Sequence, residues 1–270
     1  MDLVFAAIDI GSNSTNLLII DQSGQTLERI VRSTRLGANV ATTGALSAES
    51  MQRTLECLSE YESLIKQHRV SRRRTVATAA CRVANNTNQF FAEVKKISGT
   101  EPELISGEIE GALSFVGATS SLDEKMATLV IDIGGASTEL MVGTETLDFA
   151  VSIPFGAVNL TEAELHRDPP RPEELTNAIS LVSDAIDDVA HNYPLIGQID
   201  RVVGVAGTIV TVAAVEVGQK TFDPSALHKL KLSREGVEDV FRTVATEPLA
   251  LRIQNPGLTD DRADIIVAGC

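Results

Sequence analysis

The stretch that decides the fold is AAIDIGSNSTNLLII at residues 6–20, and it has an echo, LVIDIGGASTELMV, at residues 129–142. In both stretches an apolar run reaches Ile-Asp-Ile-Gly, passes through small polar residues and resumes as a second apolar run. Asp9 and Asp132 occupy the same place in the two copies, 123 residues apart. Two apolar runs around a glycine-containing turn are typical of a β-hairpin. The doubling predicts two related domains, each containing one such hairpin.

The turns of the two hairpins have the chemistry of an anion site. Glycine lets the backbone approach a ligand closely, and successive outward N–H groups form a nest for phosphate. An aspartate just before such a turn is a poor direct ligand for phosphate but a good one for Mg²⁺. One Asp-Gly hairpin alone is usually only a turn, whereas two copies favour phosphate binding. The residues expected to contact phosphate are Gly11, Ser12, Asn13 and Ser14 in the first turn and Gly134, Gly135, Ala136, Ser137 and Thr138 in the second.

Seven short motifs follow one another along nearly the whole chain. They are DIGSNST (9–15), ATAACR (77–82), ISGEIEGALSF (105–115), DIGGASTEL (132–140), SIPFGAV (152–158), GVAGT (204–208) and DRADII (261–266). In this order they resemble the Ppx/GppA branch of the actin, sugar kinase and DnaK-type chaperone superfamily. That branch contains exopolyphosphatases and guanosine pentaphosphate phosphohydrolases.

The resemblance implies an α/β fold of two actin-like (ribonuclease H-like) domains. Each is expected to be a mixed five-stranded sheet flanked by helices, with an interdomain cleft between the two hairpins. We expect the first domain at residues 1–123 and the second at 124–270, with a hinge in Ser120–Lys125. The DRADII motif is expected to begin a last helix, and family members continue that helix. We therefore expect the sequence to be truncated within it at Cys270.

The composition is that of an ordinary soluble globular protein. With 270 residues, 43% of them hydrophobic and 22% charged, the chain is long enough for two domains with cores of their own. The net charge of −14 argues against nucleic acid as a partner, because a nucleic-acid surface is broadly basic. A polyanionic substrate would have to be held locally, by backbone amides, a metal ion and a few arginines.

Two further features bear on where the protein works. The apolar run Leu3–Ile10 is too short to span a bilayer and follows an acidic residue, so we expect neither a signal peptide nor a membrane partner. The cysteines, Cys57, Cys81 and Cys270, are widely spaced and form no C-x-x-C pair, which argues against disulfides and a zinc site. A cytoplasmic protein is the expectation that fits both features.

Candidate catalytic carboxylates stand in two places. Glu108 and Glu110 lie in the first turn of a predicted helix that opens at Gly107, where the helix dipole alone favours acidic residues. The resemblance instead implies that Glu110 is the general base on the attacking water, with Glu108 as the second choice. In the second hairpin, Asp132 and Glu139 are the carboxylates expected to hold Mg²⁺ or to orient water, and Asp9 of the first hairpin is expected to be a further ligand of the ion.

Further substrate contacts are expected at three other positions. Arg82 follows a predicted strand at Thr75–Ala80, where an arginine suits either an interdomain ion pair or a bidentate phosphate contact, and the resemblance favours phosphate. Gly207 and Thr208 lie at a strand-to-helix junction that offers amides to phosphate. Arg262 resembles an interdomain or phosphate-facing residue of the family.

The chain departs from the family pattern at two points. The second turn reads Gly134-Gly135-Ala136 where the family usually has three glycines, and alanine narrows the freedom of the backbone. Asn159 stands where members often have a basic residue.

The arginines at 69 and 72–74 suit either a solvated helix end or the guidance of polyphosphate.

The expected function is Mg²⁺-dependent release of terminal orthophosphate from inorganic polyphosphate. The chain contains no G-x-x-x-x-G-K-[ST], no G-x-G-x-x-G and no G-x-S-x-G, so P-loop, Rossmann and nucleophile-elbow mechanisms are not supported. The alternatives are hydrolysis of guanosine pentaphosphate (pppGpp), a small-molecule kinase, and a non-catalytic polyphosphate or nucleotide sensor. The resemblance is also consistent with a homodimer.

Overall fold

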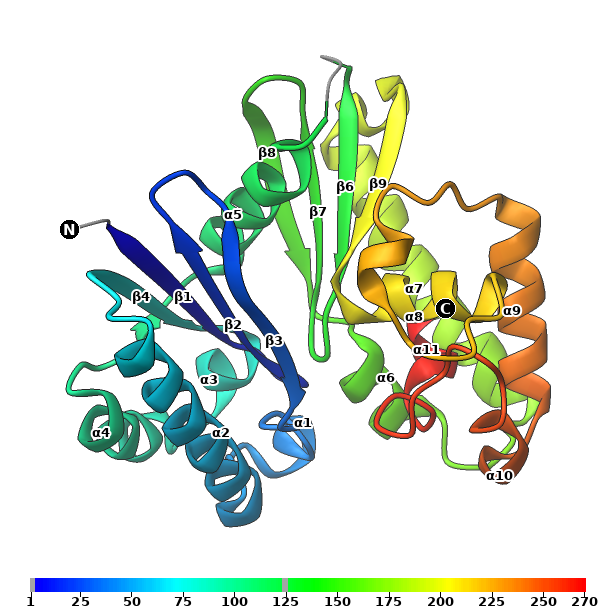
Figure 1. The fold of residues 1–270 in the computed structure, drawn as a ribbon. Coiled ribbons are helices and arrows are strands. Elements are labelled where there is room, and N and C mark those ends of the chain that lie inside the picture. The colour runs from blue at the N-terminus through cyan, green and yellow to red at the C-terminus, as the bar shows by residue number, and fades with distance from the viewer. Residues whose placement is uncertain (1–2, 123–125) are drawn as a thin grey trace. The chain divides into compact units, whose positions relative to one another are not determined.

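The structure is a computed structural model that describes residues 3–122 and 126–270. The chain divides into two compact units, Met1–Ser106 and Gly107–Cys270, each with its own sheet and helices (Figure 1). This confirms the expected α/β fold with two sheets flanked by helices. The boundary expected at 123/124, and part of the expected hinge, lie outside the described residues. The described units divide earlier because the helix that begins at Gly107 packs on the second sheet.

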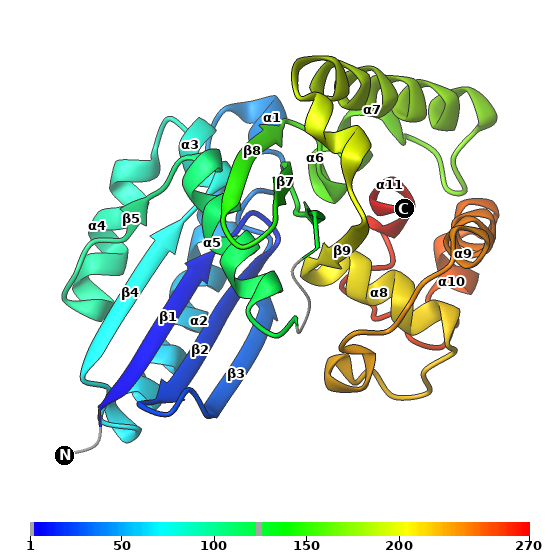
Figure 2. The same cartoon turned by 90° about the horizontal axis from the view of Figure 1, so that it is seen from above.

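The first unit contains a five-stranded mixed sheet in the order β3-β2-β1-β4-β5. Its strands are β1 (Val4–Ile10), β2 (Ser14–Asp21), β3 (Thr26–Ser33), β4 (Arg72–Ala77) and β5 (Glu103–Leu104). β1 and β2 form the predicted hairpin, with Asp9 opposite Asn16, and β4 runs parallel to β1. Figure 2 shows β3, β2, β1 and β4 side by side in that order.

Helices cover one face of this sheet. They are α1 (Val40–Thr43), α2 (Ala48–Gln67), α3 (Ala79–Val83) and α4 (Thr87–Ser98). α2 starts where predicted, because the Ser47 side chain accepts a hydrogen bond from the Ser50 N–H and caps it. The buried alternate residues of β1 and β2 pack under α2 and α4. Tyr61 of α2 donates its hydroxyl to the Thr15 carbonyl (2.8 Å), so the helix is tied to the hairpin.

The basic residues at 72–74 do not form a solvated helix end. They begin β4, three residues before the predicted start of that strand, with Arg74 opposite Ala7 of β1. Arg73 pairs with Glu62, and Arg74 makes a bidentate contact with Glu103 (2.9 and 3.0 Å). The strand extends because Arg73 and Arg74 are matched by carboxylates of neighbouring elements.

The second unit contains a mixed sheet in the order β8-β7-β6-β9. Its strands are β6 (Thr128–Ile133), β7 (Thr138–Gly143), β8 (Leu147–Ile153) and β9 (Arg201–Val205). β6 and β7 form the second predicted hairpin. Five strands were expected, whereas the described residues contribute four. After β9 and its following helix, the chain from residue 217 to 233 folds into turns and a 3₁₀ helix rather than an added edge strand.

Helices flank both faces of the second sheet. They are α5 (Gly107–Thr119), α6 (Ala157–Glu164), α7 (Pro172–Asn192), α8 (Ala206–Glu216), α9 (Arg234–Thr246), α10 (Leu249–Arg252) and α11 (Ile266–Gly269), with 3₁₀ helices η1 (Pro194–Gln198) and η2 (Pro224–Leu227). α5 covers the face that contains Val130 and Met141, and α7 packs against the opposite face through Val189. The last helix begins at Ile266 rather than Asp261, because residues 261–265 form turns.

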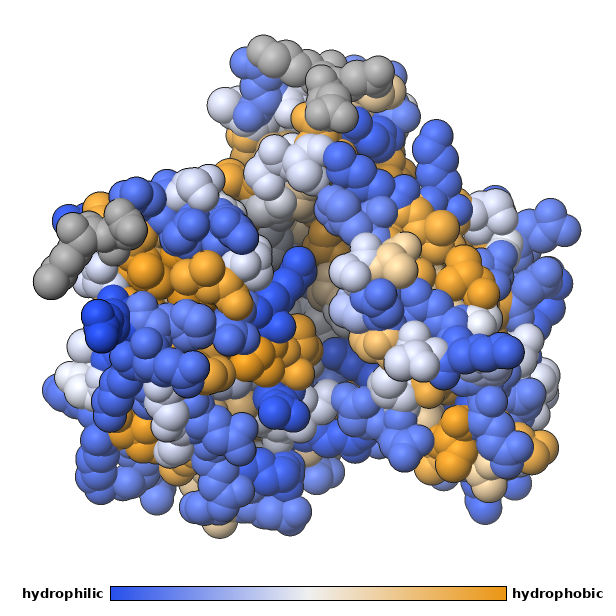
Figure 3. Space-filling model, viewed as in Figure 1, coloured by the Kyte–Doolittle hydropathy of each residue, from blue (hydrophilic) through white to orange (hydrophobic). Residues whose placement is uncertain are grey.

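On the face drawn in Figure 3, hydrophilic residues predominate and apolar residues form separate patches. Across residues 3–122 and 126–270, no helix has the length and apolar character needed to cross a bilayer.

Candidate functional site

Two carboxylates face each other across the second hairpin. Asp132 of β6 lies directly opposite Glu139 of β7, and Ser152 of β8 is the next residue along the same row. Because opposed residues in a sheet share a face, all three lie on the side that α5 covers. Ser152 donates its hydroxyl to Glu139 Oε1 (2.7 Å), and Glu139 is only 2% exposed.

The helix α5 brings Glu110 to this pair. Gly107 and Gly111, one helical turn apart, lie against β8: a Cβ at Gly107 would be 2.7 Å from Ser152 Cβ, and one at Gly111 3.0 Å from Ala150 Cβ. The missing side chains therefore allow the helix to approach the strand closely. Glu110 lies between the two glycines in sequence and is half-buried, whereas Glu108 is exposed. Of the two candidate bases, Glu110 is the one that acts electrostatically on both carboxylates of the hairpin.

Burial and mutual repulsion perturb the carboxylates. Burial raises the pKa of Asp132 to about 6; the Ser114 hydroxyl, which donates to Asp132 Oδ2 (3.0 Å), opposes this shift, and the charge of Glu110 adds to it. Burial, followed by the charge of Glu110, raises the pKa of Glu139 to about 7. Hydrogen bonds from Ser152 and Ser137 work in the opposite direction. The cluster disfavours its own negative charge, which is the condition under which a cation is bound or a proton is accepted.

The carbonyl groups of the second hairpin turn point toward the segment that follows β8. They accept hydrogen bonds from the segment that follows β8: Ala157 N–H to Gly134 O (2.9 Å), Val158 N–H to Gly135 O (2.8 Å), Asn159 N–H to Gly135 O (3.1 Å) and Asn159 Nδ2 to Ala136 O (3.0 Å). The N–H of each following residue points the opposite way across the planar peptide. Within the described residues, the N–H groups of Gly135, Ala136 and Ser137 donate to no acceptor. They form a nest of the kind that binds phosphate oxygens.

The alanine of this turn fits without strain. Ala136 is absent from the described non-glycine residues with a positive φ, so its backbone conformation does not require glycine. Thr138 donates its hydroxyl to the Phe155 carbonyl (2.7 Å), so this side chain fastens the turn to the segment after β8.

The first hairpin turn repeats this arrangement. Its inward hydrogen bonds are Gly37 N–H to Ser12 O (2.7 Å), Arg35 N–H to Asn13 O (2.9 Å) and Ala80 N–H to Ser12 Oγ (3.1 Å). Among the described residues, the main-chain N–H groups of Ser12 and Asn13 have no acceptor. The Asn13 side-chain oxygen is buried without a hydrogen-bond partner. Gly11 donates to the Ser14 carbonyl (2.9 Å), as Gly134 does to Ser137 (3.0 Å).

Asp9 and Arg82 are positioned within the first unit. Asp9 Oδ2 accepts a hydrogen bond from Asn16 Nδ2 (3.0 Å). Arg82 lies in α3, directly after β4, and donates from Nη1 to the Ile105 carbonyl (3.1 Å). The predicted strand that should have contained Ala79 and Ala80 ends at Ala77, because the chain turns there into α3.

Gly207, Thr208 and Arg262 meet at the start of α8. β9 is parallel to β6 with Val205 opposite Asp132. The start of α8, which follows Val205 directly, therefore lies at the same end of the strands as the carboxylates. The Arg262 guanidinium lies against Gly207, where a Cβ would be 2.1 Å from Nη2. Thr208 is 2% exposed and packs near Gly269.

Sequence reasoning missed Ser114 and Ser152. Ser114 lies four residues after Glu110, so both face the sheet from one side of α5. Ser152 begins the SIPFGAV motif, and only the pairing of β7 with β8 places it opposite Glu139. The helical spacing was a usable signal for Ser114, whereas the strand register was not visible in the sequence.

The donor set fits Mg²⁺ in its chemistry. All candidate ligands are oxygen atoms, and the two carboxylates, whose pKa values are raised, gain from a cation. No group of three or more His, Cys, Asp or Glu side chains in the described parts of the chain is arranged to hold a metal ion. Mg²⁺ usually takes one or two carboxylates and completes its coordination with water and substrate phosphate, so a pair suffices.

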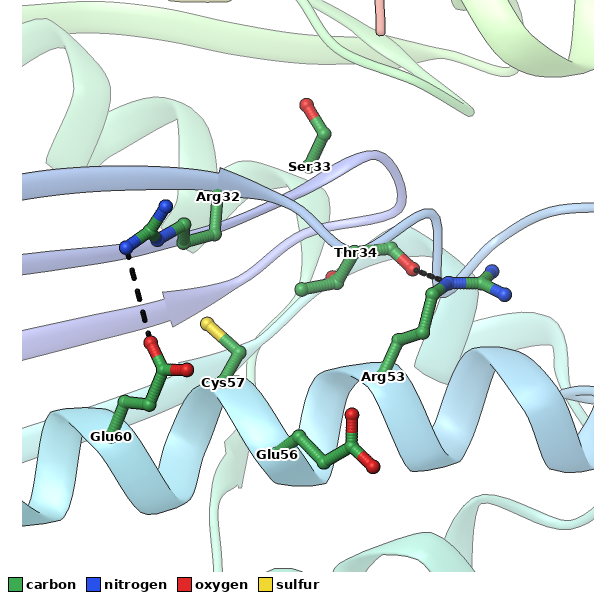
Figure 4. Close-up of a pocket in the computed structure, with 7 residues that line it drawn as sticks. All are labelled: Arg32, Ser33, Thr34, Arg53, Glu56, Cys57 and Glu60. Carbon is green, nitrogen blue, oxygen red and sulfur yellow. Dashed lines mark hydrogen bonds and ion pairs between the residues drawn. The ribbon is translucent and has the colours of Figure 1, made fainter.

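A separate cavity of about 270 Å³ lies between β3 and α2 (Figure 4). Arg32 approaches Glu60 across it (3.9 Å), and Arg53 donates from Nε to the Thr34 carbonyl (3.1 Å). None of the predicted site residues lines this cavity.

Comparisons with known proteins agree with these features. The model of the Ppx/GppA phosphatase family matches residues 17–270. Exopolyphosphatase 2 of Mycobacterium tuberculosis (strain H37Rv) is 34% identical over 98% of this chain and 86% of its own length. A guanosine-5'-triphosphate,3'-diphosphate pyrophosphatase of Pseudoalteromonas translucida is 32% identical over 98% of this chain, which spans 53% of that relative.

Solved structures give the same result. The Aquifex aeolicus member of the Ppx/GppA family superposes with a TM-score of 0.81 at 32% identity, covering 100% of this chain and 88% of the other. An exopolyphosphatase-like protein reaches a TM-score of 0.94 at 32% identity, with 99% and 86% covered. Both the sequence matches and the shared fold lead to one conclusion: this chain belongs to the Ppx/GppA phosphatase family.

Proposed function

We propose that this protein hydrolyses the terminal phosphoanhydride bond of inorganic polyphosphate and releases orthophosphate. The observation that carries the proposal is the half-buried Asp132 and the buried Glu139 beside Glu110, with amides in the same hairpin that have no acceptor among the described residues. The similarity to an exopolyphosphatase over 98% of the chain supports this choice of substrate.

The amides would bind the terminal phosphate. The N–H groups of Gly135, Ala136 and Ser137 are available for its oxygens, and fixed donors of this kind stabilise the charge that develops as the phosphoryl group is transferred. Gly11–Ser14, Arg82, Gly207, Thr208 and Arg262 stay predicted substrate contacts.

Mg²⁺ would be held by Asp132 and Glu139, with Asp9 as a further predicted ligand. When bound, the ion would neutralise negative charge on the phosphate oxygens. Ser114 and Ser152 would keep the two carboxylates oriented through the hydrogen bonds they donate.

Glu110 would act as the general base. A water oxygen attacks the terminal phosphorus, the bond to the bridging oxygen breaks, and the proton of the water passes to the Glu110 carboxylate. The electron pair of the broken bond remains on the shortened polyphosphate. No covalent bond to the protein is formed.

The test is orthophosphate release from long polyphosphate in the presence of Mg²⁺. Glu110→Gln should reduce turnover by roughly 10²–10⁴-fold, the usual contribution of a general base, without loss of folding. Glu108→Gln, an exposed neighbour on the same helix turn, is the matched control and should retain turnover. Near-normal turnover by Glu110→Gln would remove Glu110 from the mechanism.

The second candidate substrate is pppGpp, because relatives named for that nucleotide also match 98% of the chain. The same assay with pppGpp decides between the two, since the preferred substrate gives the larger kcat/KM. ADP production with a small-molecule acceptor would indicate a kinase instead. Binding without phosphate release would indicate a sensor.

A further inference from the structure

The main-chain donors of the segment after β8 satisfy two of the three carbonyls of the second turn. Ala157, Val158 and Asn159 direct their N–H groups to Gly134 and Gly135. Gly156 lies directly on the turn, where a Cβ would be 2.5 Å from the Gly135 carbonyl carbon. The third carbonyl, that of Ala136, is reached by a side chain, the amide of Asn159 (3.0 Å).

In the first hairpin, the corresponding carbonyl accepts its hydrogen bond from a main-chain group. Asn13 is the counterpart of Ala136, 123 residues earlier, and its carbonyl accepts from the main-chain N–H of Arg35 (2.9 Å). The Asn159 side chain therefore does in the second unit what a backbone amide does in the first. A side chain can be replaced by mutation, so this contact can be tested in isolation.

The Asn159 side chain is fixed on every side. Its Oδ1 accepts from the Gly156 N–H (2.7 Å), and its Nδ2 donates to the Pro154 carbonyl (2.9 Å) as well as to Ala136. Both donors and the acceptor are used, which leaves one orientation for the amide. Through Ala136 O it fixes the peptide plane whose other end is the N–H of Ser137.

We propose that Asn159 is a positioning residue for anion binding: its side-chain amide holds the Ala136 carbonyl inward and thereby aims the Ser137 N–H at a bound phosphate group. Without this hydrogen bond the carbonyl is free to turn toward the anion and repel it. The proposal rests on the proposed function in that the anion is a phosphate of the substrate, but it concerns binding and not the chemical step.

The experiment compares Asn159→Asp and Asn159→Ala with the wild type. Asn159→Asp keeps the acceptor for Gly156 and removes the donor to Ala136, whereas Asn159→Ala removes both. The control is Asn177→Ala, because Asn177 is exposed on α7. Tripolyphosphate binding with Mg²⁺ is measured by calorimetry, and thermal unfolding verifies folding.

Both Asn159 variants should bind tripolyphosphate roughly tenfold more weakly, as expected for a lost hydrogen bond to a charged group, and KM should rise more than kcat falls. A second measurement is specific to the peptide plane: amide NMR of the wild type should show a tripolyphosphate-dependent shift of the Ser137 N–H that Asn159→Asp loses.

Three results would overturn the proposal: no tripolyphosphate binding by the wild type, unchanged affinity in folded Asn159→Asp, or a Ser137 shift that persists in that variant. The proposed function fails separately. If the wild type binds tripolyphosphate and the uncharged variant Asn159→Ala weakens binding, but no polyphosphate is hydrolysed, the positioning role stands and the exopolyphosphatase assignment falls.

Discussion

The two hairpins have the same backbone arrangement but differ in the residue that lies opposite the aspartate. In both, an aspartate is the last residue but one of the first strand, and the next strand runs antiparallel. Each turn directs carbonyls to a neighbouring segment and has amides that find no acceptor among the described residues. Opposite Asp9 stands Asn16, which donates an amide N–H to it. Opposite Asp132 stands Glu139, a second carboxylate.

This difference places an acidic centre beside the nest of the second hairpin and not beside that of the first. An amide beside Asp9 stabilises its charge, whereas a carboxylate beside Asp132 adds repulsion, and the pKa values of Asp132 and Glu139 are raised. The third strand of each sheet differs at the same position. The residue opposite Asn16 is the exposed, apolar Val31, whereas the residue opposite Glu139 is the polar Ser152. The repeated hairpin gives both units the same backbone arrangement. The residue that pairs with the aspartate then determines whether the charge of that aspartate is stabilised or opposed.

The largest effect on turnover is expected when the residue opposite Asp132 is replaced by the asparagine that lies opposite Asp9 in the first hairpin. Glu139→Asn should reduce polyphosphate turnover roughly 10³-fold, because the second carboxylate of the centre is lost. Turnover is measured with Mg²⁺ at saturating substrate. Glu56→Asn, on the exposed side of α2, should be unchanged. If Glu139→Asn turns over at the wild-type rate, the difference between the hairpins is not a functional one.

The raised pKa of Glu139 should make stability depend on pH. With Mg²⁺ removed by a chelator, the folded protein keeps this proton up to pH about 7, whereas the unfolded chain releases it near 4.5. The folded state binds more protons in this window, so the free energy of unfolding should fall as the pH rises from about 4.5 to 7, by about 3 kcal/mol from Glu139.

Urea unfolding at a series of pH values measures this dependence. Glu139→Gln should make the profile less steep, since the glutamine has no proton to lose, and the part of the slope that comes from Asp132 should remain. Mg²⁺ at pH 7.5 should restore more stability to the wild type than to the variant. A wild-type profile as flat as that of Glu139→Gln would contradict the burial of an ionisable group at this position.

The reverse exchange should make the first hairpin resemble the second. Asn16→Glu replaces the donor to Asp9 by a like charge, so we expect a destabilisation of about 1–2 kcal/mol at pH 8 that shrinks at pH 4, where the carboxylates become protonated. Asn16→Leu is the control, because it removes the donor without adding charge. Equal pH dependence in the two variants would rule out repulsion as the cause.

The smallest effect is expected at the third strand. Ser152→Ala removes the hydroxyl that donates to Glu139 (2.7 Å) and should lower kcat/KM roughly fivefold, the equivalent of about 1 kcal/mol. Ser180→Ala on the exposed side of α7 should leave it unchanged. An equal response of the two serine variants would mean that Ser152 does not orient the carboxylate.

Local patterns in the sequence predicted much of the fold. Both hairpins, the helix capped by Ser47 and the helix that opens at Gly107 are where they were expected, because caps, apolar periodicity and turn residues act over a few positions. The start of β4 was misplaced, because the arginines at its beginning are matched by Glu62 and Glu103, which are distant in sequence.

The candidate site divides in the same way. The repeated Ile-Asp-Ile-Gly marked Asp9 and Asp132, and the family resemblance marked Glu110 and Glu139, all without a structure. Their roles stay predictions. The second sheet has four described strands where five were expected, and the segment after α8 forms turns and a 3₁₀ helix instead of pairing with β9.

The sequence by itself determined the duplication and the hairpin turns, because these depend on residue type and short spacing, and its resemblance to the Ppx/GppA family indicated the class of chemistry. Only the tertiary structure decided which groups act together. Ser152 reaches Glu139 through strand register, and Asn159 reaches Ala136 from 23 residues away. The direction of a peptide N–H depends on what holds the carbonyl at its other end, and that partner lies on another element of the fold.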